Sequence, residues 1–248
     1  YMTLKIENLT GGYFGTTVLK DVDFTVNDGE LVGLIGLNGA GKSTTIQEII
    51  GLLTPYQGQI LLDGLSITQD AESYRKKIGF IPEQPSLYEE LTLREHIEVT
   101  ALAYDVAPDV ALARAEKMLK TFRLSDKLDW FPANFSKGMK QKVMIICAFL
   151  TEPSLYIIDE PFLGLDPLAI NDLIDLMIEM KKTGASILMS THILSTAEKF
   201  CDKFIVLHEG QVIADGDLAA LRAKFNLPEA SLDEIYVALT DESWQAHG

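Results

Sequence analysis

Short apolar runs, most of them rich in β-branched residues, recur along the chain and predict nine strands. They are LKIENL (4–9), VDFTV (22–26), LVGLIGL (31–37), QILLDG (59–64), IGFIP (78–82), LYIID (155–159), SILMS (186–190), FIVLHEG (204–210) and QVIADG (211–216). Stretches with helical spacing separate the later runs, and strands that alternate with helices are typical of an α/β protein with a mostly parallel sheet. The early runs follow one another more directly, which predicts an antiparallel β edge.

The strand signal is absent between Glu90 and Leu150. Two stretches there, LREHIEVTALAY (93–104) and PDVALARAEKMLKTF (108–122), repeat apolar residues at helical spacing. We therefore expect an all-helical subdomain inserted into the α/β domain. The predicted division is a discontinuous α/β core over 1–85 and 151–225, a helical segment over 86–150 and a short helical tail over 226–248.

The tail contains one further helical pattern, SLDEIYVALT (231–240). Ser231 and Glu234 have the spacing of a capping box at its start. Its apolar face consists of Leu232, Ile235, Tyr236 and Leu239. We expect this helix to pack on its own domain.

Composition narrows the class of protein. Of the 248 residues, 47% are hydrophobic, and 36 acidic against 21 basic residues give a formal net charge of −15. This charge argues against a nucleic-acid-binding protein, which needs a basic face.

Cys147 and Cys201 lie in apolar surroundings without metal-ligand spacing, so we expect both to be reduced. No signal peptide is recognisable and no apolar run reaches the ~18 residues of a membrane helix, so we expect a cytoplasmic protein that reaches a membrane only through a partner.

The strongest motif is G-x-x-x-x-G-K-[ST], which spans Gly36 to Ser43. It follows the run LVGLI and leads into the helix-forming stretch STTIQEIIGLL, which is the strand–loop–helix context of a phosphate-binding P-loop. Glycines let successive backbone N–H groups point into one concavity, Lys42 supplies a positive charge for the β- and γ-phosphates, and the Ser43 hydroxyl can bind Mg²⁺. The alternative, a glycine-rich turn before a helix, does not explain why pattern and context agree.

Two further strand ends carry candidate chemistry. Asp159 follows four apolar residues at the end of LYIID, where α/β sheets place ligands, and fits a Mg²⁺-binding aspartate. The next residue, Glu160, is placed to polarise the water that attacks a γ-phosphate. His192 ends a second apolar strand and can donate a hydrogen bond to that phosphate. A solvated Asp-Glu turn and a satisfied surface histidine are the alternatives.

The stretch NFSKGMKQKV (134–143) raises a separate question. Ser136 fits the N-cap of a helix that runs through Phe149, yet Lys137, Lys140 and Lys142 follow in its first turns. The helix dipole already makes this end positive, so cations there are unfavourable. Either the lysines extend into water, or an anion from elsewhere binds at this helix end.

Taken together, these motifs resemble those of the ATP-binding subunits of ABC transporters over nearly the full chain. GLNGAGKST (36–44) resembles their Walker A motif, LYIIDE (155–160) Walker B with its glutamate, LGLD (163–166) the D-loop, and STH (190–192) the switch histidine. The resemblance implies a P-loop NTPase with a RecA-like mixed sheet. It also implies that Tyr13 stacks on adenine, with Phe14 as the alternative.

The same resemblance answers the question of the lysines, because NFSKGMKQKV occupies the place of the family's signature, Leu-Ser-Gly-Gly-Gln. Two subunits are expected to enclose two ATP molecules, with each signature helix pointing at the γ-phosphate held by the other subunit. Phe135, Lys137 and Met139 depart from the family pattern, whereas Ser136 and Gly138 are retained. The implied ATP-binding residues are Tyr13, Gly36, Leu37, Asn38, Gly39, Ala40, Gly41, Lys42, Ser43, Thr44, Ser136, Gly138 and Asp166, with Ser43, Asp159 and Glu83 at Mg²⁺.

A second departure concerns the glutamine that the family places after IGFIP. Glu83 stands there and Gln84 follows, so which of the two contacts the metal stays open. FPANFSKGMKQKVMIICAFL (131–150) and YIIDEPFLGLDPLAI (156–170) most resemble EcsA-type exporter ATPases of Gram-positive bacteria. That resemblance implies an integral-membrane, EcsB-type permease partner and a position on the inner face of the cell membrane. The rival functions are a soluble ABC-type ATPase acting on nucleic acid or ribosomes, and a P-loop kinase.

Overall fold

The computed structural model describes residues 2–240, and the nine expected strands all form within them. The strands are β1 (Met2–Tyr13), β2 (Thr16–Asn27), β3 (Leu31–Ile35), β4 (Gln57–Leu62), β5 (Ile78–Ile81), β6 (Leu155–Asp159), β7 (Ser186–Thr191), β8 (Lys203–His208) and β9 (Gln211–Gly216). Six of them form one sheet in the order β5-β6-β7-β3-β8-β9, parallel except for the last strand. This arrangement confirms the predicted α/β fold with a mixed sheet.

The early strands pair antiparallel, as predicted, but they form a separate sheet in the order β2-β1-β4. Strands β1 and β2 are 12 residues long, about twice the length of the apolar runs that predicted them. The hairpin between them turns at Phe14 and Gly15, which both have positive φ (49° and 82°). Backbone pairing along the hairpin extends each strand beyond its apolar run. The pattern of hydrophobic residues does not predict this extension, and in β2 the added residues are mostly exposed.

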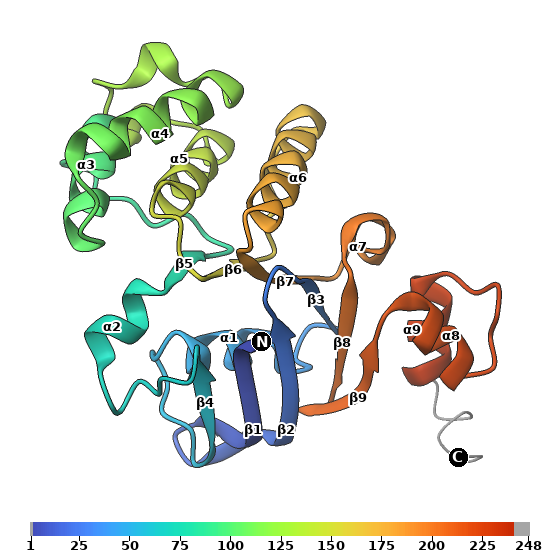
Figure 1. Cartoon of the computed structure of the whole chain (residues 1–248). Coiled ribbons are helices and arrows are strands. Elements are labelled where there is room, and N and C mark those ends of the chain that lie inside the picture. The colour runs from blue at the N-terminus through green and yellow to red at the C-terminus, as the bar shows by residue number, and fades with distance from the viewer. Residues whose placement is uncertain (1, 241–248) are drawn as a thin grey trace.

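The helical segment lies at the β5 end of the parallel sheet (Figure 1). No strand lies between β5 and β6 in this fully described stretch, which confirms the helical insertion. The helices of the segment are α3 (Leu93–Ala103), α4 (Pro108–Thr121) and α5 (Lys137–Leu150), with short 3₁₀ turns η1 (Ser125–Lys127) and η2 (Pro132–Asn134). The other helices are α1 (Lys42–Ile49), α2 (Ala71–Lys76), α6 (Pro167–Lys182), α7 (Leu194–Phe200), α8 (Leu218–Lys224) and α9 (Leu232–Thr240). Of these, α2 had no counterpart in the sequence prediction.

The parallel sheet is buried on both faces because successive residues of each strand point to opposite sides. In β3, Leu31 and Ile35 belong to the core beneath helices α3 to α7, whereas Val32 and Leu34 belong to the core beneath α1 and the antiparallel sheet. The first core also contains buried residues of α3, α4 and α5. The helical segment and the sheet therefore share one continuous hydrophobic core.

The C-terminal helix α9 forms as predicted and lies beside α8, beyond β9 (Figure 1). The capping box is present: Ser231 N donates to Glu234 Oε2 at 2.8 Å, and Glu234 N donates to Ser231 Oγ at 3.2 Å. The four residues of its apolar face are buried in the core that contains the helical segment: Leu232, Ile235, Tyr236 and Leu239. The expected packing on its own domain is thus confirmed, while positions 241–248 of the predicted tail lie outside the described residues.

None of the helices within residues 2–240 has the length and apolar character needed to cross a membrane. Cys147 and Cys201 are both free thiols, and both are half-buried at the edge of the core rather than within it. Burial raises the pKa of Cys147 to about 11, so this thiol is protonated and unreactive at neutral pH.

Candidate functional site

The P-loop connects the carboxyl end of β3 to the first turn of α1. Gly41 precedes the helix with φ of 111°, a conformation that favours glycine. Gly36 lies so close to β8 that an added Cβ would approach the Leu207 carbonyl oxygen at 2.6 Å. These two glycines let the loop fold back tightly beside the sheet before the helix begins.

A cavity of about 560 Å³ opens over this loop at the carboxyl ends of the parallel strands. It is lined by Tyr13, Val18, Leu37, Asn38, Gly39, Gly41, Lys42, Ser43, Thr44, Glu83, Asp159, Glu160, Leu163 and His192. Twelve of these fourteen are residues that the sequence singled out, and Val18 and Leu163 are additional. Gly36 and Ala40 lie within the loop without lining the cavity, and Ser136, Gly138 and Asp166 lie outside it.

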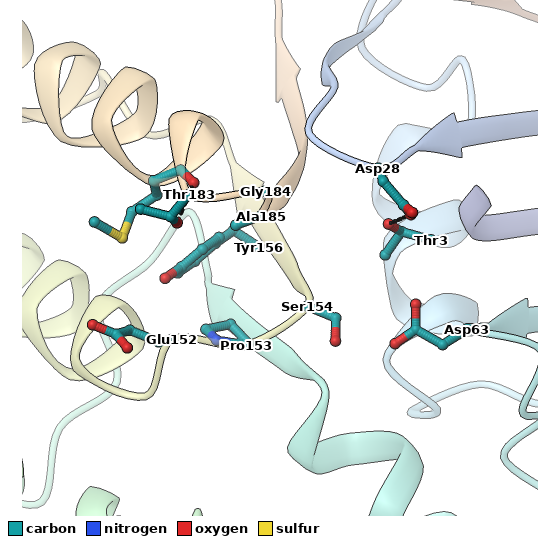
Figure 2. A pocket seen from close by; sticks show the side chains of 11 residues that line it. Thr3, Asp28, Asp63, Glu152, Pro153, Ser154, Tyr156, Thr183, Gly184 and Ala185 are labelled. Atoms are coloured by element: carbon teal, nitrogen blue, oxygen red, sulfur yellow. Dashed lines mark hydrogen bonds between the residues drawn. The ribbon is translucent and has the colours of Figure 1, made fainter. Parts of the chain in front are cut away.

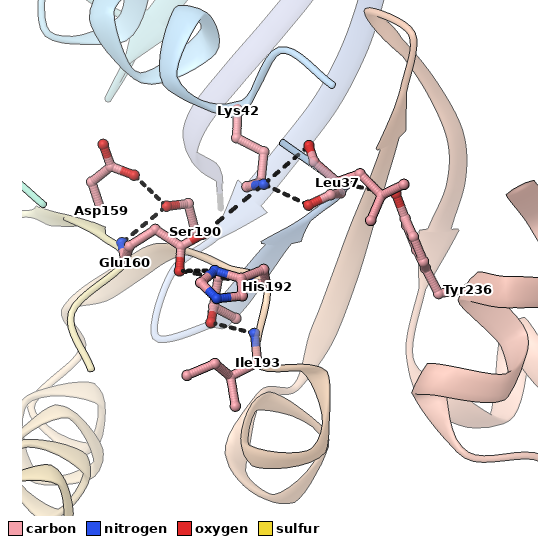
Figure 3. Close-up of polar contacts among 10 residues, drawn as sticks. Leu37, Lys42, Asp159, Glu160, Ser190, His192, Ile193 and Tyr236 are labelled. Atoms are coloured by element: carbon pink, nitrogen blue, oxygen red, sulfur yellow. Dashed lines mark hydrogen bonds and ion pairs between the residues drawn. The ribbon is translucent and has the colours of Figure 1, made fainter. Parts of the chain in front are cut away.

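Lys42 reaches across the loop rather than into solvent (Figure 3). Its Nζ donates to Gly36 O at 2.5 Å and Leu37 O at 3.4 Å, and it lies 4.0 Å from Glu160 Oε1. Only 7% of the residue is exposed. Burial lowers the pKa of Lys42, while the nearby carboxylates act in the opposite direction. The ammonium group is thus held at the mouth of the loop, where phosphate oxygens would meet it.

Asp159 and Glu160 are positioned through Ser190, a residue that the sequence analysis did not select. Ser190 Oγ donates to Asp159 Oδ1 at 2.5 Å, and Glu160 N donates to both Ser190 O and Ser190 Oγ at 3.1 Å. Burial raises the pKa of Asp159, while the Ser190 hydrogen bond opposes this change. Ser190 starts the STH stretch, so its place two residues before the histidine was the available signal.

Glu160 and His192 face each other across the ends of β6 and β7 (Figure 3). His192 Nδ1 lies 2.9 Å from Glu160 Oε2, and His192 N donates to the same oxygen at 3.3 Å. Glu160 is buried and has a positive φ of 46°, a conformation that is uncommon outside glycine. The backbone therefore holds this carboxylate between Lys42 and His192.

Tyr13 lies against α1 at the edge of the cavity. Its hydroxyl donates to Gln47 Oε1 at 2.9 Å, and Thr44 Oγ1 donates to the Tyr13 hydroxyl at 3.4 Å. Phe14 is fully exposed at the tip of the β1–β2 hairpin and does not line the cavity. The position of Tyr13 at the cavity thus favours it over Phe14 as the residue that stacks on adenine. The stacking itself stays a prediction.

Glu83 lines the cavity, whereas Gln84 is exposed outside it. The charge of Glu83 acts on both Lys42 and Asp159, which locates its carboxylate near them. Within residues 2–240 no group of three or more His, Cys, Asp or Glu side chains forms a metal site.

The signature stretch begins α5, outside the cavity. Ser136 is the N-cap residue, and its Oγ accepts a hydrogen bond from Met139 N at 3.2 Å. Ser136 and Lys137 are exposed. Gly138 lies against the D-loop, where an added Cβ would come within 2.8 Å of Gly164 O. The predicted helix and cap are therefore confirmed, and Gly138 also has a packing reason to be glycine.

The D-loop aspartate, Asp166, has a structural role in this chain. It is the N-cap of α6, and its Oδ1 accepts from Ala169 N at 2.9 Å. Lys142 Nζ lies 4.0 Å from Asp166 Oδ2, so one of the puzzling lysines of α5 faces an acidic partner. The helix starts of α5 and α6 are thus in contact within one chain.

A second cavity of about 470 Å³ lies at the opposite, amino ends of β6 and β7 (Figure 2). Its charged side chains are the carboxylates Asp28, Asp63 and Glu152, and no lysine or arginine lines it. Phosphate groups would meet like charge there. The cavity over the P-loop is therefore the one suited to a nucleotide.

A P-loop lysine, an Asp-Glu pair at a strand end and a facing histidine in one cavity define a nucleotide-hydrolysing P-loop protein. Residues 19–163 match the family model described as ABC transporter. The chain is 59% identical over 239 residues to the ABC-type transporter ATP-binding protein EcsA of Bacillus subtilis (strain 168), which covers 96% of this chain and 97% of that protein.

Solved structures agree with this match. A structure described as the ATP binding subunit of an ABC transporter superposes with a TM-score of 0.94 at 56% identity, covering 96% of this chain and 100% of the other. The structure of cbiO1 from Clostridium perfringens superposes with a TM-score of 0.77 at 30% identity, covering 90% and 91%.

The chain therefore belongs to the ATP-binding subunits of ABC transporters, as its motifs predicted. It binds ATP and hydrolyses it to power transport, and it acts with a membrane permease. The two rival functions, a soluble ATPase on nucleic acid or ribosomes and a P-loop kinase, are not favoured.

Proposed function

We propose the following roles at the ATP site, carried by the meeting of Lys42, Asp159, Glu160 and His192 in one cavity. Lys42 binds the β- and γ-phosphates, and those N–H groups of residues 36–44 that face the cavity cradle them. Tyr13 stacks on adenine. Ser43, Asp159 and Glu83 hold Mg²⁺, which when bound would neutralise charge on the β- and γ-phosphates.

Glu160 is the catalytic carboxylate in this proposal. It takes the proton of a water molecule as the water oxygen attacks the γ-phosphorus and the bond to the ADP oxygen breaks. Lys42 lies 4.0 Å from one Glu160 oxygen and His192 Nδ1 lies 2.9 Å from the other. Two nitrogen groups thus flank the reacting position, and both can stabilise the negative charge of the transferred phosphoryl group.

We further propose that two chains enclose two ATP molecules and that each Ser136 serves the site of the partner. The start of α5 supports this arrangement, because Ser136 and Lys137 are exposed and lie outside the chain's own cavity. A helix N-terminus favours an anion. The Gly138 N–H and Lys137 would then meet the γ-phosphate bound by the partner's P-loop. Asp166, at the adjoining helix start, would lie at the same interface.

Mixed dimers test this arrangement directly. Ser136→Arg damages the site of the partner, whereas Lys42→Ala damages the chain's own site, so each homodimer has two broken sites. A mixed dimer of the two variants, isolated by tandem tags, regains one whole site and should occlude labelled ATP. Ser125→Arg, which adds the same charge at an exposed serine of the helical segment, is the matched control. Mixed dimers that occlude no ATP would count against the proposed exchange between chains.

The proposed partner is an integral-membrane permease of the EcsB type, because the chain is similar to EcsA over nearly its full length. By the same similarity we propose that the complex exports its substrate and holds this subunit on the inner face of the cell membrane. The α/β core (1–85 and 151–225) would hydrolyse ATP, and the helical segment (86–150) would transmit the motion. The segment 226–248 is proposed as a short C-terminal helical tail of the subunit.

A groove of about 210 Å³ is the proposed permease-docking surface. Residues from β5, from the loop after it, from α3 and its C-cap, and from α5 line it: Phe80, Ser86, Leu87, Tyr88, His96, Thr100, Tyr104, Met144, Cys147 and Ala148. Tyr88 is 64% exposed at its rim. The Tyr88 backbone is held because Tyr88 N donates to His96 Nε2 at 2.9 Å. The groove thus joins the Glu83 loop to the helical segment, and Glu83 lines the ATP cavity.

A further inference from the structure

The C-terminal helix touches the P-loop at one polar point. Tyr236, on α9, has a hydroxyl that accepts a hydrogen bond from Leu37 N at 2.6 Å (Figure 3). Tyr236 is 6% exposed and lies 199 positions away from Leu37 in the sequence. This bond connects the tail to the second residue of the phosphate-binding loop.

The bond acts on the same peptide group that contacts Lys42. The Leu37 N–H and the Gly36 carbonyl belong to one peptide plane, and the Gly36 oxygen accepts from Lys42 Nζ at 2.5 Å. The peptide therefore lies between the Lys42 ammonium on one side and the Tyr236 hydroxyl on the other. Hydrogen bonds in such a chain polarise one another and strengthen both ends.

Glycine at position 36 makes this peptide easy to rotate, because glycine has the widest choice of backbone angles. Within residues 2–240 the Tyr236 hydroxyl is the hydrogen-bond partner of the Leu37 N–H, so without it the donor side of the peptide plane is unsupported. A rotated peptide would turn its oxygen away from Lys42 and change where the ammonium rests. Tyr236 thus fixes the orientation of a peptide on which the position of Lys42 depends.

The tail is also well placed to hold Tyr236 firmly. Leu232, Ile235 and Leu239 on the same helix face are buried. Leu232 N donates at 3.2 Å to Glu198 Oε2 on α7, the helix that follows His192. The α9 helix therefore contacts both the loop that carries Lys42 and the helix that follows the switch histidine.

We propose that Tyr236 is a positioning residue of the ATP site, and that the seating of α9 sets the affinity of the P-loop for ATP. This inference rests on the proposed binding of phosphate by Lys42. It makes the C-terminal helix a point at which ATP affinity can be tuned without any change in the cavity itself.

Tyr236→Phe tests the proposal, since it removes only the hydroxyl. A lost neutral hydrogen bond corresponds to roughly a fivefold change, so the Kd for ATP and the KM should rise by about that factor while kcat changes less than twofold. The matched control is Tyr74→Phe, because the Tyr74 hydroxyl donates to Ile49 O at 2.7 Å and Tyr74 is also buried but does not line the cavity. The control should lose stability without losing affinity.

Leu37→Pro separates the hydrogen bond from packing, because proline has no N–H to donate. Leu37 is not among the residues with positive φ, so its backbone conformation does not exclude proline. In the Leu37→Pro chain, adding Tyr236→Phe should alter the Kd by less than twofold. Hydrogen exchange of the Leu37 amide in Tyr236→Phe should speed up, which gives a readout even if the proline variant does not fold.

An unchanged Kd in Tyr236→Phe, or a full fivefold loss on top of Leu37→Pro, would overturn the inference. Lys42→Ala distinguishes this failure from a failure of the ATP-site assignment. If Lys42→Ala loses ATP and Tyr236→Phe does not, only the role of Tyr236 is wrong. If Lys42→Ala binds ATP normally, the phosphate site itself is misassigned.

Discussion

Glu48 carries an unusual electrostatic cost inside the helix that follows the P-loop. The residue is 2% exposed, and within residues 2–240 neither of its carboxylate oxygens has a hydrogen-bond partner. It lies against Gly11 so closely that an added Cβ there would overlap the carboxylate. Burial raises the pKa of Glu48 from its ordinary 4.5 to about 7. We predict that Glu48→Gln, which resembles the protonated acid in shape and charge, removes a pH-dependent penalty on folding.

The sign follows from proton binding. Between pH 4.5 and about 7 the unfolded chain has released the Glu48 proton while the folded chain still holds it, so stability falls as the pH rises. Below pH 4.5 the penalty is absent, and above about 7 it is complete. Each pKa unit is worth about 1.36 kcal/mol, so the penalty in the wild-type chain reaches roughly 3 kcal/mol.

Urea unfolding of both chains at pH 5, 6, 7 and 8 measures this difference. The free energy of unfolding of Glu48→Gln, minus that of the wild type, should grow by roughly 2.5 kcal/mol from pH 5 to pH 8, because a small part of the penalty is already present at pH 5. Glu116→Gln is the matched control: this exposed residue of α4 has a pKa lowered by its hydrogen bond to Lys120, so its difference should stay flat over that range. A Glu48→Gln difference that does not change with pH would refute the reasoning.

Three further predictions concern the proposed roles. Lys42→Ala should weaken ATP binding by roughly 1.5–3 kcal/mol, the range for a charged hydrogen bond, and calorimetry showing unchanged affinity would contradict the P-loop assignment. Glu160→Gln should bind ATP normally but hydrolyse it ~10²–10⁴-fold more slowly, and wild-type turnover in a phosphate-release assay would move the base elsewhere. Tyr88→Glu should abolish co-purification with the permease while ATP affinity is kept, whereas Leu52→Glu, at another exposed apolar position, should have no effect. Normal co-purification of Tyr88→Glu would place docking on another surface.

Local sequence patterns predicted most of the fold because they are set by near neighbours. Apolar runs marked the strands, and the absence of such runs between Glu90 and Leu150 marked the helical segment. Residue order could not tell that the early strands form their own sheet. The composition of each sheet depends on which strands pair with each other. Here β1 pairs with both β2 and β4, and this three-stranded sheet is separate from the parallel one.

The motifs predicted the residues that line the cavity, but they did not predict the residues that hold these side chains and the P-loop in place. Each predicted residue of the cavity sits in a motif that places it at a strand end or in the P-loop. Ser190 and Tyr236 act through hydrogen bonds to residues far away in the sequence. The spacing of hydrophobic residues along the chain does not predict such contacts. Gly138 was predicted for its N–H, yet its approach to Gly164 O became visible only when the two loops were brought together.

The hydrophobic core shared by the helical segment and the parallel sheet determines how this subunit unfolds. Tyr156 and Ile158 of β6 pack in the same cluster as Ile97 of α3 and Phe149 of α5. Cutting the chain between these layers would expose apolar surface on both pieces, so neither piece has a complete interior of its own. Thermal melting should therefore follow one cooperative transition. A protease that cleaves only opened chain would find segment and sheet susceptible at the same temperature.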